Sequence, residues 1–227
     1  MSIEERRQKL QATLSEVTES CGRQAQEVVL LPVTKRQPLE KLQTLYDLGE
    51  RHFGENQVQE MNDKAAVLAD DIHWHLIGTL QSNKVKAALE NAEYIHSVDS
   101  LKLLKRIDRL AGELAKQPKL FLQVNVSGEE SKHGFTQEEL KSALAESLNL
   151  KNVTVIGLMT MAVKSADEEG NFSVFDELRE LRDSYRAEYP QLTELSMGMS
   201  ADFPEAVRAG STWVRIGSAL LGERTYS

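Results

Sequence analysis

A lysine stands where an apolar stretch of the chain ends. Residues 28–33 read VVLLPV, an aliphatic run typical of a buried strand, and Thr34 and Lys35 follow directly. The simpler interpretation is a solvated charge where a strand meets a loop. The alternative is chemical. A lysine in a closed pocket loses solvation, so its pKa falls and its neutral amine can attack a carbonyl to form a Schiff base.

A second group of candidate residues lies near the C-terminal end, in SMGMS (196–200) and RIGSAL (215–220). Small residues let backbone N–H groups approach an anion closely, and Ser200 can add a hydroxyl. Asp202, with Glu205 three positions later, indicates that a helix begins there. Gly217 and Ser218 offer the same chemistry in the second segment. The pattern suits a phosphate group, although a turn of small residues would have the same sequence.

Two further motifs carry weaker signals. The segment GTLQSNK (78–84) has the length of a nucleotide P-loop, but Asn83 stands where the second glycine belongs and Val85 where a magnesium-binding hydroxyl belongs. His73 and His75 share one face of a strand and could suit a metal. No third ligand is evident, so packing and hydrogen bonding are the better interpretation for these histidines.

The composition limits the class of protein. The chain has 227 residues and a formal net charge of −8, which argues against a nucleic-acid backbone as the main partner. Cys21 is the sole cysteine and cannot form an internal disulfide, which suits a reducing compartment. Residues 1–17 are charged and contain no apolar signal core, and no window approaches eighteen apolar residues. We therefore expect a cytoplasmic protein that does not enter a membrane.

Strand-like and helical patterns alternate along the chain. Helical spacing covers residues 3–20, and eight strand-like runs follow with a helical pattern in each of the seven gaps. The runs are 27–35, 51–56, 73–80, 94–99, 119–126, 153–160, 194–199 and 213–220. Such alternation predicts parallel strands, and eight units close a (β/α)8 TIM barrel, here a single domain over residues 1–227. An open doubly wound sheet is the competing architecture. Only LGERTYS follows the last run, so the helix at 3–20 is expected to cover the place of an eighth helix.

The barrel changes how the candidate residues are interpreted, because its chemistry lies where the strands end. The loops after the seventh and eighth strands form the usual phosphate site of such barrels. Lys35, at the end of the first strand, would then line the same mouth. A reactive amine opposite a phosphate site fits a phosphorylated aldehyde, either pyridoxal phosphate or a sugar phosphate.

Long motifs in a fixed order resemble one family. VTK, FGENQVQE, WHLIGTLQSNK, VNVSGEESKHGF, GLMTMA and LSMGMSADFPEAVRAGSTWVRIGSALLGER together span about residues 22–224. They resemble the pyridoxal phosphate homeostasis protein family, whose fold is the barrel of alanine racemase without its second domain. One departure is visible: family members commonly read SKTKP where this chain reads TKRQP, so Gln37 replaces a lysine.

The resemblance implies roles for individual residues. Lys35 would carry pyridoxal 5'-phosphate as an internal aldimine. Ser200, Gly217 and Ser218 would contact the phosphate with Met199 close by, Asn56 would pack near the ring, and Arg215 would face the pyridine nitrogen. Lys132 matches a family lysine, and whether it is a second attachment point is left open.

The resemblance also implies a function. We expect a monomeric protein that holds pyridoxal phosphate, acts in vitamin B6 homeostasis as a buffer or carrier, and delivers the cofactor to apo-enzymes without efficient amino-acid turnover. Arg215 cannot accept the proton that makes the ring a strong electron sink. No tyrosine of the chain lies at a predicted strand end, where a second catalytic acid would be needed. The alternatives are an amino-acid racemase or decarboxylase of the same barrel type and, less well supported, a Schiff-base aldolase.

Overall fold

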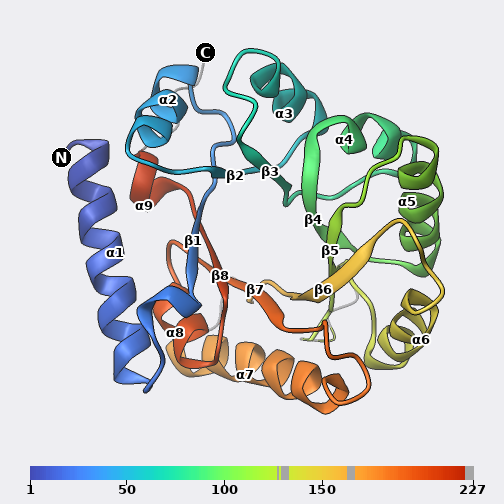
Figure 1. The fold of residues 1–227 in the computed structure, drawn as a ribbon. Coiled ribbons are helices and arrows are strands. Elements are labelled where there is room, and N and C mark those ends of the chain that lie inside the picture. Colours follow the sequence, from blue (N-terminus) through green and yellow to red (C-terminus); the bar gives the residue numbers. More distant parts are fainter. Residues whose placement is uncertain (127, 129–132, 163–166, 223–227) are drawn as a thin grey trace.

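Eight parallel strands form one sheet that closes into a barrel (Figure 1). The computed structural model describes residues 1–126, 128, 133–162 and 167–222. The spatial order is β1-β8-β7-β6-β5-β4-β3-β2. A bridge between Val33 and Gly54 joins the first and last strands of this series. The strands are β1 (Val29–Pro32), β2 (His52–Glu55), β3 (His73–Leu76), β4 (Ala92–Val98), β5 (Lys119–Gln123), β6 (Thr154–Met159), β7 (Glu194–Met199) and β8 (Trp213–Ile216).

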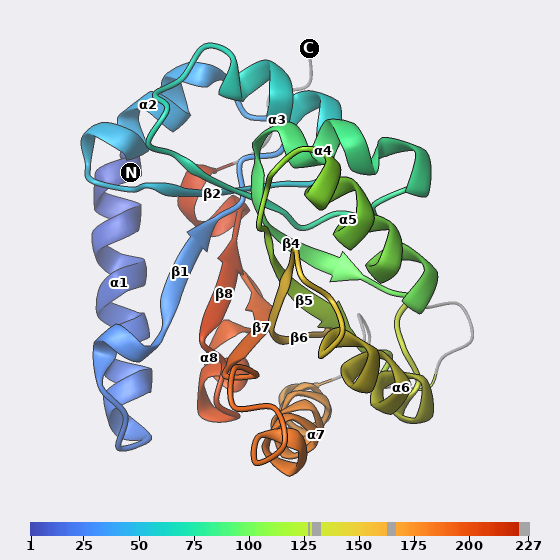
Figure 2. The ribbon, with the colours of Figure 1, turned by 45° about the vertical axis from the view of Figure 1, so that its right-hand side comes forward.

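Helices connect the strands and cover the outside of the sheet (Figures 1 and 2). They are α1 (Ile3–Ser20), α2 (Leu39–Asp47), α3 (Val58–Ala65), α4 (Val85–Asn91), α5 (Leu101–Glu113), α6 (Gln137–Ser147), α7 (Glu168–Tyr185), α8 (Phe203–Arg208) and α9 (Ser218–Leu221). Short 3-10 turns occupy Ala25–Glu27 and Ser82–Lys84. The predicted (β/α)8 barrel is confirmed. Among the described residues, no helix combines the length and apolar character needed to cross a lipid bilayer.

The predicted eighth strand, 213–220, is too long. β8 ends at Ile216, and α9 begins at Ser218. Gly217, with φ −106° and ψ −89°, turns the chain out of the extended conformation. Its carbonyl then accepts hydrogen bonds from the N–H groups of Leu220 and Leu221. The predicted strand 27–35 is also shorter, because a 3-10 turn precedes β1 and a turn beginning at Thr34 follows it.

The N-terminal helix closes the outer layer of the barrel. A capping box between Ser2 and Glu5 starts α1, which packs against α2, α8 and α9. Figure 1 shows α1 outside β1, beside the short α9 that follows β8. The prediction that residues 3–20 cover the place of an eighth long helix is confirmed.

The barrel has two separate layers of buried side chains. The larger lies between the strands and the helices, and a smaller apolar cluster of Leu31, Tyr94, Phe121, Met159 and Trp213 lies apart from it, on residues that the strands contribute. Polar side chains join this smaller cluster: His75, His96, Ser196 and Arg215 are at most 5% exposed. A hydrogen bond from β4 to β7, between His96 and Ser196, crosses the barrel interior, because these strands are not neighbours in the sheet. The interior is therefore partly polar, unlike the aliphatic filling common in such barrels.

Candidate functional site

The C-terminal ends of the strands surround a cavity of about 270 Å³. We call this end the upper mouth. Loops after β2, β3, β5 and β6 supply its walls, which are Asn56, Ile77, Gly78, Thr79, Gln123, Val124, Asn125, His133, Thr160 and Met161. The cavity has the position expected for the chemistry of this fold.

Asn56 reaches this cavity because a glycine lies beside it. A Cβ atom on Gly78 would lie 2.1 Å from the backbone oxygen of Asn56, which is shorter than any real contact. Only glycine lets the loops after β2 and β3 approach so closely. The structure therefore assigns a packing role to the glycine of the GTL motif and places Asn56, a predicted site residue, at the mouth.

Lys35 is half-buried in a tight turn directly after β1. The N–H of Gln37 donates to the carbonyl of Thr34 over 3.1 Å, which defines a turn across residues 34–37. Arg36 has φ 55°, in the left-handed region that non-glycine residues rarely adopt. Lys35 thus lies between a buried threonine and a strained neighbour.

A buried ionic cluster holds both neighbours of Lys35. We call Glu55, Glu60 and Lys64 the Lys64 cluster. The Lys64 ammonium lies 2.7 Å from a carboxylate oxygen of Glu55 and 2.8 Å from one of Glu60. It also donates to the carbonyl of Thr34 over 2.8 Å, and the Thr34 hydroxyl donates to Glu55 over 2.6 Å. On the other side, the N–H of Arg36 donates to Glu60 over 2.5 Å.

The electrostatics of the Lys64 cluster are those of a buried ion pair. Glu55 is fully buried, and this burial raises the pKa of its carboxyl above the usual range. Its second oxygen has no hydrogen-bond partner within the described part of the chain. Sequence reasoning missed this cluster. The available signal was Glu60 and Lys64 at helical i,i+4 spacing next to the lysine turn.

Gln37, which replaces a lysine of the family motif, has a structural role. It is 6% exposed, and its side-chain oxygen accepts a hydrogen bond from the Lys41 ammonium over 2.7 Å. Lys41 also donates to the carbonyl of Leu221 at the end of α9 over 2.8 Å. Gln37 and Lys41 therefore tie the loop after β1 to the segment after β8.

The predicted phosphate loops do meet each other. The Ser200 hydroxyl oxygen lies 3.3 Å from the backbone nitrogen of Gly217 and 3.5 Å from that of Ala219. Two backbone N–H groups at the start of α9 therefore point toward one oxygen position. Ser218 is exposed, and Gly217 is half-buried. The loop after β7 and the loop after β8 form one group of donors.

The loop between β7 and α8 differs from its prediction in one detail. α8 begins after Asp202 as expected, but the Asp202 carboxylate does not cap that helix. It accepts instead from the N–H of Met199 over 2.6 Å, which tightens the loop that carries Ser200. Gly198, with φ 92°, lets this loop lie directly against α8. Met199 itself is 39% exposed at the end of β7.

Arg215 lies in the barrel interior just below the upper mouth and is 5% exposed. Its guanidinium donates to the carbonyl and hydroxyl of Ser196, both over 2.7 Å, and to the carbonyl of Thr160 over 3.0 Å. These acceptors are uncharged, and no salt bridge to Arg215 occurs within the described residues. Burial lowers the pKa of Arg215 to about 10, so it remains cationic at neutral pH. A buried cation with uncharged partners suits an electron-rich ligand at the mouth.

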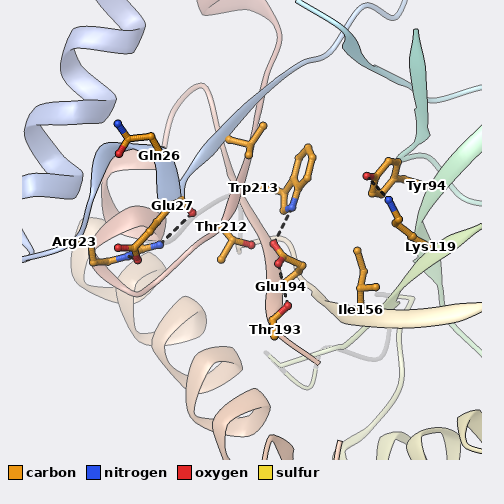
Figure 3. A pocket seen from close by; sticks show the side chains of 11 residues that line it. Arg23, Gln26, Glu27, Tyr94, Lys119, Ile156, Thr193, Glu194, Thr212 and Trp213 are labelled. Atoms are coloured by element: carbon orange, nitrogen blue, oxygen red, sulfur yellow. Dashed lines mark hydrogen bonds and ion pairs between the residues drawn. The ribbon is translucent and has the colours of Figure 1, made fainter. Parts of the chain in front are cut away.

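A second hollow, of about 550 Å³, lies at the opposite end of the barrel, which we call the lower mouth (Figure 3). Its charged side chains already have protein partners. Arg23 pairs with Glu27, Lys119 contacts Glu93 and the Tyr94 hydroxyl, and Glu194 accepts from the Trp213 indole. The lower mouth is the larger of the two hollows, but it lies at the N-terminal ends of the strands. In this fold, residues at that end usually contribute to stability rather than to chemistry. We therefore place the candidate site at the upper mouth.

His73 and His75 pack and form hydrogen bonds, as the sequence favoured. His75 stacks on Tyr94 with ring centroids 4.1 Å apart, and His73 pairs with Glu93. Over the described ranges, no group of three side chains could hold a metal ion. Sequence reasoning missed His52 and His96, which contact His75 on either side.

The predicted residues lie in separate groups at the strand ends, and of those that the structure describes, Asn56 alone lines the cavity. Ser200, Gly217 and Ser218 lie on adjoining loops, and Arg215 reaches Thr160, which lines the cavity together with Asn56. Lys35 lies on the turn between β1 and α2, outside the set of residues that line the cavity. Lys132 falls outside the described residues.

The matching family model is the alanine racemase, N-terminal domain, which covers residues 7–225. A protein of Synechocystis sp. named pyridoxal phosphate homeostasis protein is 42% identical over 200 residues, or 87% of this chain and 92% of its own length. A protein of the same name from Aquifex aeolicus is 40% identical over 228 residues and all of both chains. The chain belongs to the pyridoxal phosphate homeostasis protein family.

Solved structures agree with this family assignment. PipY of Synechococcus elongatus without PLP is 40% identical, with a TM-score of 0.89 over 97% of this chain and 100% of that one. PipY with PLP bound matches with a TM-score of 0.87. An alanine racemase of Clostridium difficile, 14% identical with a TM-score of 0.74, covers 96% of this chain and 60% of its own. That last likeness concerns the fold alone.

Proposed function

We propose that this chain binds pyridoxal 5'-phosphate at the upper mouth and acts in vitamin B6 homeostasis as a buffer or carrier. The observation that carries the proposal is the arrangement of that mouth. A lysine turn follows β1, and the neighbouring β8 and β7 supply a buried arginine and a convergent set of N–H and hydroxyl groups. The PLP-bound structure of PipY, at 40% identity, supports the choice of ligand.

Each part of the mouth suits one part of this ligand. The Lys35 amine would attack the aldehyde carbon and, with loss of one water, form a Schiff base. The Ser200 hydroxyl and the N–H groups of Gly217, Ser218 and Ala219 would bind phosphate oxygens. Asn56 and Met199 would line the ring, and the Arg215 guanidinium would donate toward the pyridine nitrogen.

The same residues favour retention of the cofactor over amino-acid chemistry. Bound pyridoxal phosphate supplies an electron-withdrawing ring, which is strongest when its nitrogen is protonated. Arg215 stays protonated itself at neutral pH and offers only donors, so it does not supply that proton. Among the described tyrosines, Tyr94 lies near the lower mouth, and Tyr46, Tyr185 and Tyr189 lie on or after outer helices. None of these four is placed to return a proton at the upper mouth.

The attachment point can be tested with the full chain. Load the protein with pyridoxal phosphate, record its visible absorption, reduce it with borohydride and map the modified peptide. We expect the pyridoxyl group on Lys35, and loss of the absorption in Lys35→Ala. Lys86→Ala, an exposed lysine on α4, is the matched control and should behave as wild type. A pyridoxyl group mainly on another lysine would contradict the assignment.

The carrier role needs a separate experiment. Incubate the loaded protein with a panel of L- and D-amino acids and follow chirality, carbon dioxide and keto-acid release. In parallel, mix it with an apo-form of a pyridoxal phosphate enzyme and follow the recovery of that enzyme's activity. We expect reactivation without sustained turnover. Turnover at roughly 1 per second or faster would support a racemase or decarboxylase instead.

A further inference from the structure

A continuous series of hydrogen bonds crosses the barrel from the lower mouth to Arg215. His52 Nδ1 lies 2.9 Å from His75 Nε2, and His75 Nδ1 lies 2.9 Å from His96 Nε2. His96 Nδ1 lies 2.7 Å from the Ser196 hydroxyl, which lies 2.7 Å from the Arg215 guanidinium. We call this set of hydrogen bonds the series. His52, His75 and His96 come from β2, β3 and β4. The series continues through Ser196 on β7 to Arg215 on β8.

Arg215 sets the direction of every bond in this series. A guanidinium only donates, so the Ser196 oxygen must accept from it. The Ser196 oxygen could accept a second bond, but its own hydrogen has no acceptor other than His96 Nδ1 among the described contacts, so His96 Nδ1 accepts from it. A neutral His96 therefore carries its hydrogen on Nε2 and donates to His75 Nδ1. The same argument places the hydrogen of His75, and then of His52, on Nε2.

The interior part of the series has no room for an extra proton. His75 and His96 are fully buried, and burial lowers the pKa of both well below the usual value. A protonated imidazole would donate from both nitrogens, and the next ring would have to reverse its own bond. Reversal of the whole series would leave the buried Ser196 hydroxyl hydrogen without an acceptor among the described contacts, next to the buried cation of Arg215.

The lower end of the series lies against Tyr94 and Trp213, two rings that line the hollow at the lower mouth. His52 is half-buried and stacks on His73 with ring centroids 4.7 Å apart. Burial and the neighbouring His73 lower the pKa of His52 to about 4. The ionisable groups around the series are His73 from β3, Glu93 and Tyr94 from β4, Lys119 from β5, Glu194 from β7, Arg215 from β8 and Asp202 before α8, whose charge acts on Arg215.

We propose that His52, His75 and His96 are positioning residues that hold Arg215 in one hydrogen-bonded orientation and couple its grip on a ligand at the upper mouth to the protonation state of the lower mouth. The ligand part of this inference rests on the proposed function. The bond directions do not, because they follow from the side chains alone. The series also gives the polar side chains in the barrel interior a role, orienting Arg215 by hydrogen bonds, that the neighbouring apolar cluster cannot perform.

The bond directions can be tested on the full chain without cofactor. Nitrogen-15 NMR of the histidine rings at pH 7.5 reports which nitrogen carries hydrogen. We expect Nε2–H on His52, His75 and His96. Removing the donor with Arg215→Met should mix the two tautomers at all three rings, whereas Tyr94→Phe, which changes a ring stacked on His75, should leave them unchanged. Nδ1–H on His96 or His75 in the wild-type protein, or an effect of Arg215→Met confined to His96, would overturn the inference.

The coupling to the ligand is tested by breaking the series at its midpoint. His75→Phe keeps an aromatic ring, contacts neither Ser196 nor Arg215, and should weaken pyridoxal phosphate binding by roughly 5-fold or more, the lower range of coupling between sites. It should also flatten the pH dependence of binding near pH 4, where His52 at the lower end of the series gains a proton. His75→Gln can accept one bond and donate the next, so it should restore affinity but not the pH dependence.

The outcomes separate the two proposals. Wild-type affinity and pH profile in His75→Phe would overturn the positioning role. If His75→Phe does not fold, an unaltered pH profile in His75→Gln overturns the coupling equally. If the wild-type protein fails to bind pyridoxal phosphate while the NMR pattern is as expected, the proposed function is wrong and the directed series remains.

Discussion

Lys35 follows β1 and Arg215 lies on the neighbouring strand β8, but the protein holds them in different ways. The Lys64 cluster grips the carbonyl of Thr34 and the N–H of Arg36, so it holds the backbone on both sides of Lys35. Arg215 is held by its own guanidinium, which contacts Ser196 and Thr160. One residue is anchored through the main chain, and the other through its functional group.

The difference matches the work that each residue would do. An amine that forms and breaks a covalent bond needs a side chain that can move, and a rigid backbone gives it a fixed origin. A guanidinium that orients a ring needs the opposite, because its donors must already point in one direction. The support also differs in charge: formal ions surround the lysine turn, whereas neutral imidazoles extend from the arginine.

The largest expected effect is a loss of folding stability when the Lys64 cluster, which holds the turn around Lys35, is broken. Lys64→Met leaves the Glu55 carboxylate buried without a cation, and such a loss typically costs about 3–5 kcal/mol of folding stability. Urea unfolding of the variant measures this loss, with Lys86→Met as the exposed control. The double variant Lys64→Met/Glu55→Gln should recover part of it. A variant as stable as wild type would show that the cluster does not hold this turn.

The next largest effect concerns the hydrogen-bond donors in the loops after β7 and β8. Ser200→Ala removes one hydroxyl but keeps the N–H groups of Gly217 and Ala219, so phosphate-ester binding should weaken by about 1–3 kcal/mol. Titration with pyridoxal phosphate and with pyridoxal measures the effect, and pyridoxal should bind much more weakly to the wild-type protein. Equal affinities for the two compounds would show that these loops do not bind phosphate.

Lowering the pH should change the stability contributions of the buried histidines and of Glu55 in opposite directions. Each neutral buried histidine is protonated only on unfolding, so its contribution to stability is complete above about pH 6.5 and falls by about 1.4 kcal/mol per pH unit below it. For His52 this loss continues toward its folded pKa of about 4. Glu55 acts in the opposite sense, because its raised pKa favours the folded form as the pH falls toward the carboxyl range.

Unfolding curves at pH 7, 6 and 5 test this difference. His75→Gln keeps hydrogen-bonding capacity but cannot titrate, so its stability should fall less steeply with acid than that of wild type. Glu138→Gln, an exposed carboxyl on α6, serves as the control and should follow wild type. Parallel curves for wild type and His75→Gln would mean that the buried imidazole does not contribute.

The smallest effect sharpens the account of the lysine turn. Arg36 has a left-handed backbone that costs a non-glycine residue roughly 1–2 kcal/mol. Arg36→Gly should therefore be more stable than Arg36→Ala by about 1 kcal/mol after the greater flexibility of the unfolded glycine chain is included. Thermal unfolding of the two variants compares them directly. If the alanine variant were the more stable, the turn would not be strained.

The amino-acid sequence by itself determined the barrel and the position of its mouth. Periodicity is local, so the alternation of strands and helices could be predicted without contacts, and parallel strands necessarily bring their C-terminal ends together. Ser200 and Gly217 could be predicted as neighbours for that reason. The end of β8 could not be predicted, because the small and apolar residues of IGSAL (216–220) suit a strand as well as a helix, and only the backbone angles of Gly217 show where the strand stops.

Only the tertiary structure decided how Lys35 and Arg215 are supported. Glu55 is the last residue of β2 and Lys64 lies in the last turn of α3, and no spacing rule joins either of them to Thr34. His52 and His96 each occur singly in strand-like runs, and the bond from His96 to Ser196 spans 100 residues of sequence. Such contacts arise when a closed barrel brings side chains of non-adjacent strands into one interior, where each buried polar group requires a partner. Which residues become partners depends on their positions in the folded barrel, and the sequence alone does not give those positions.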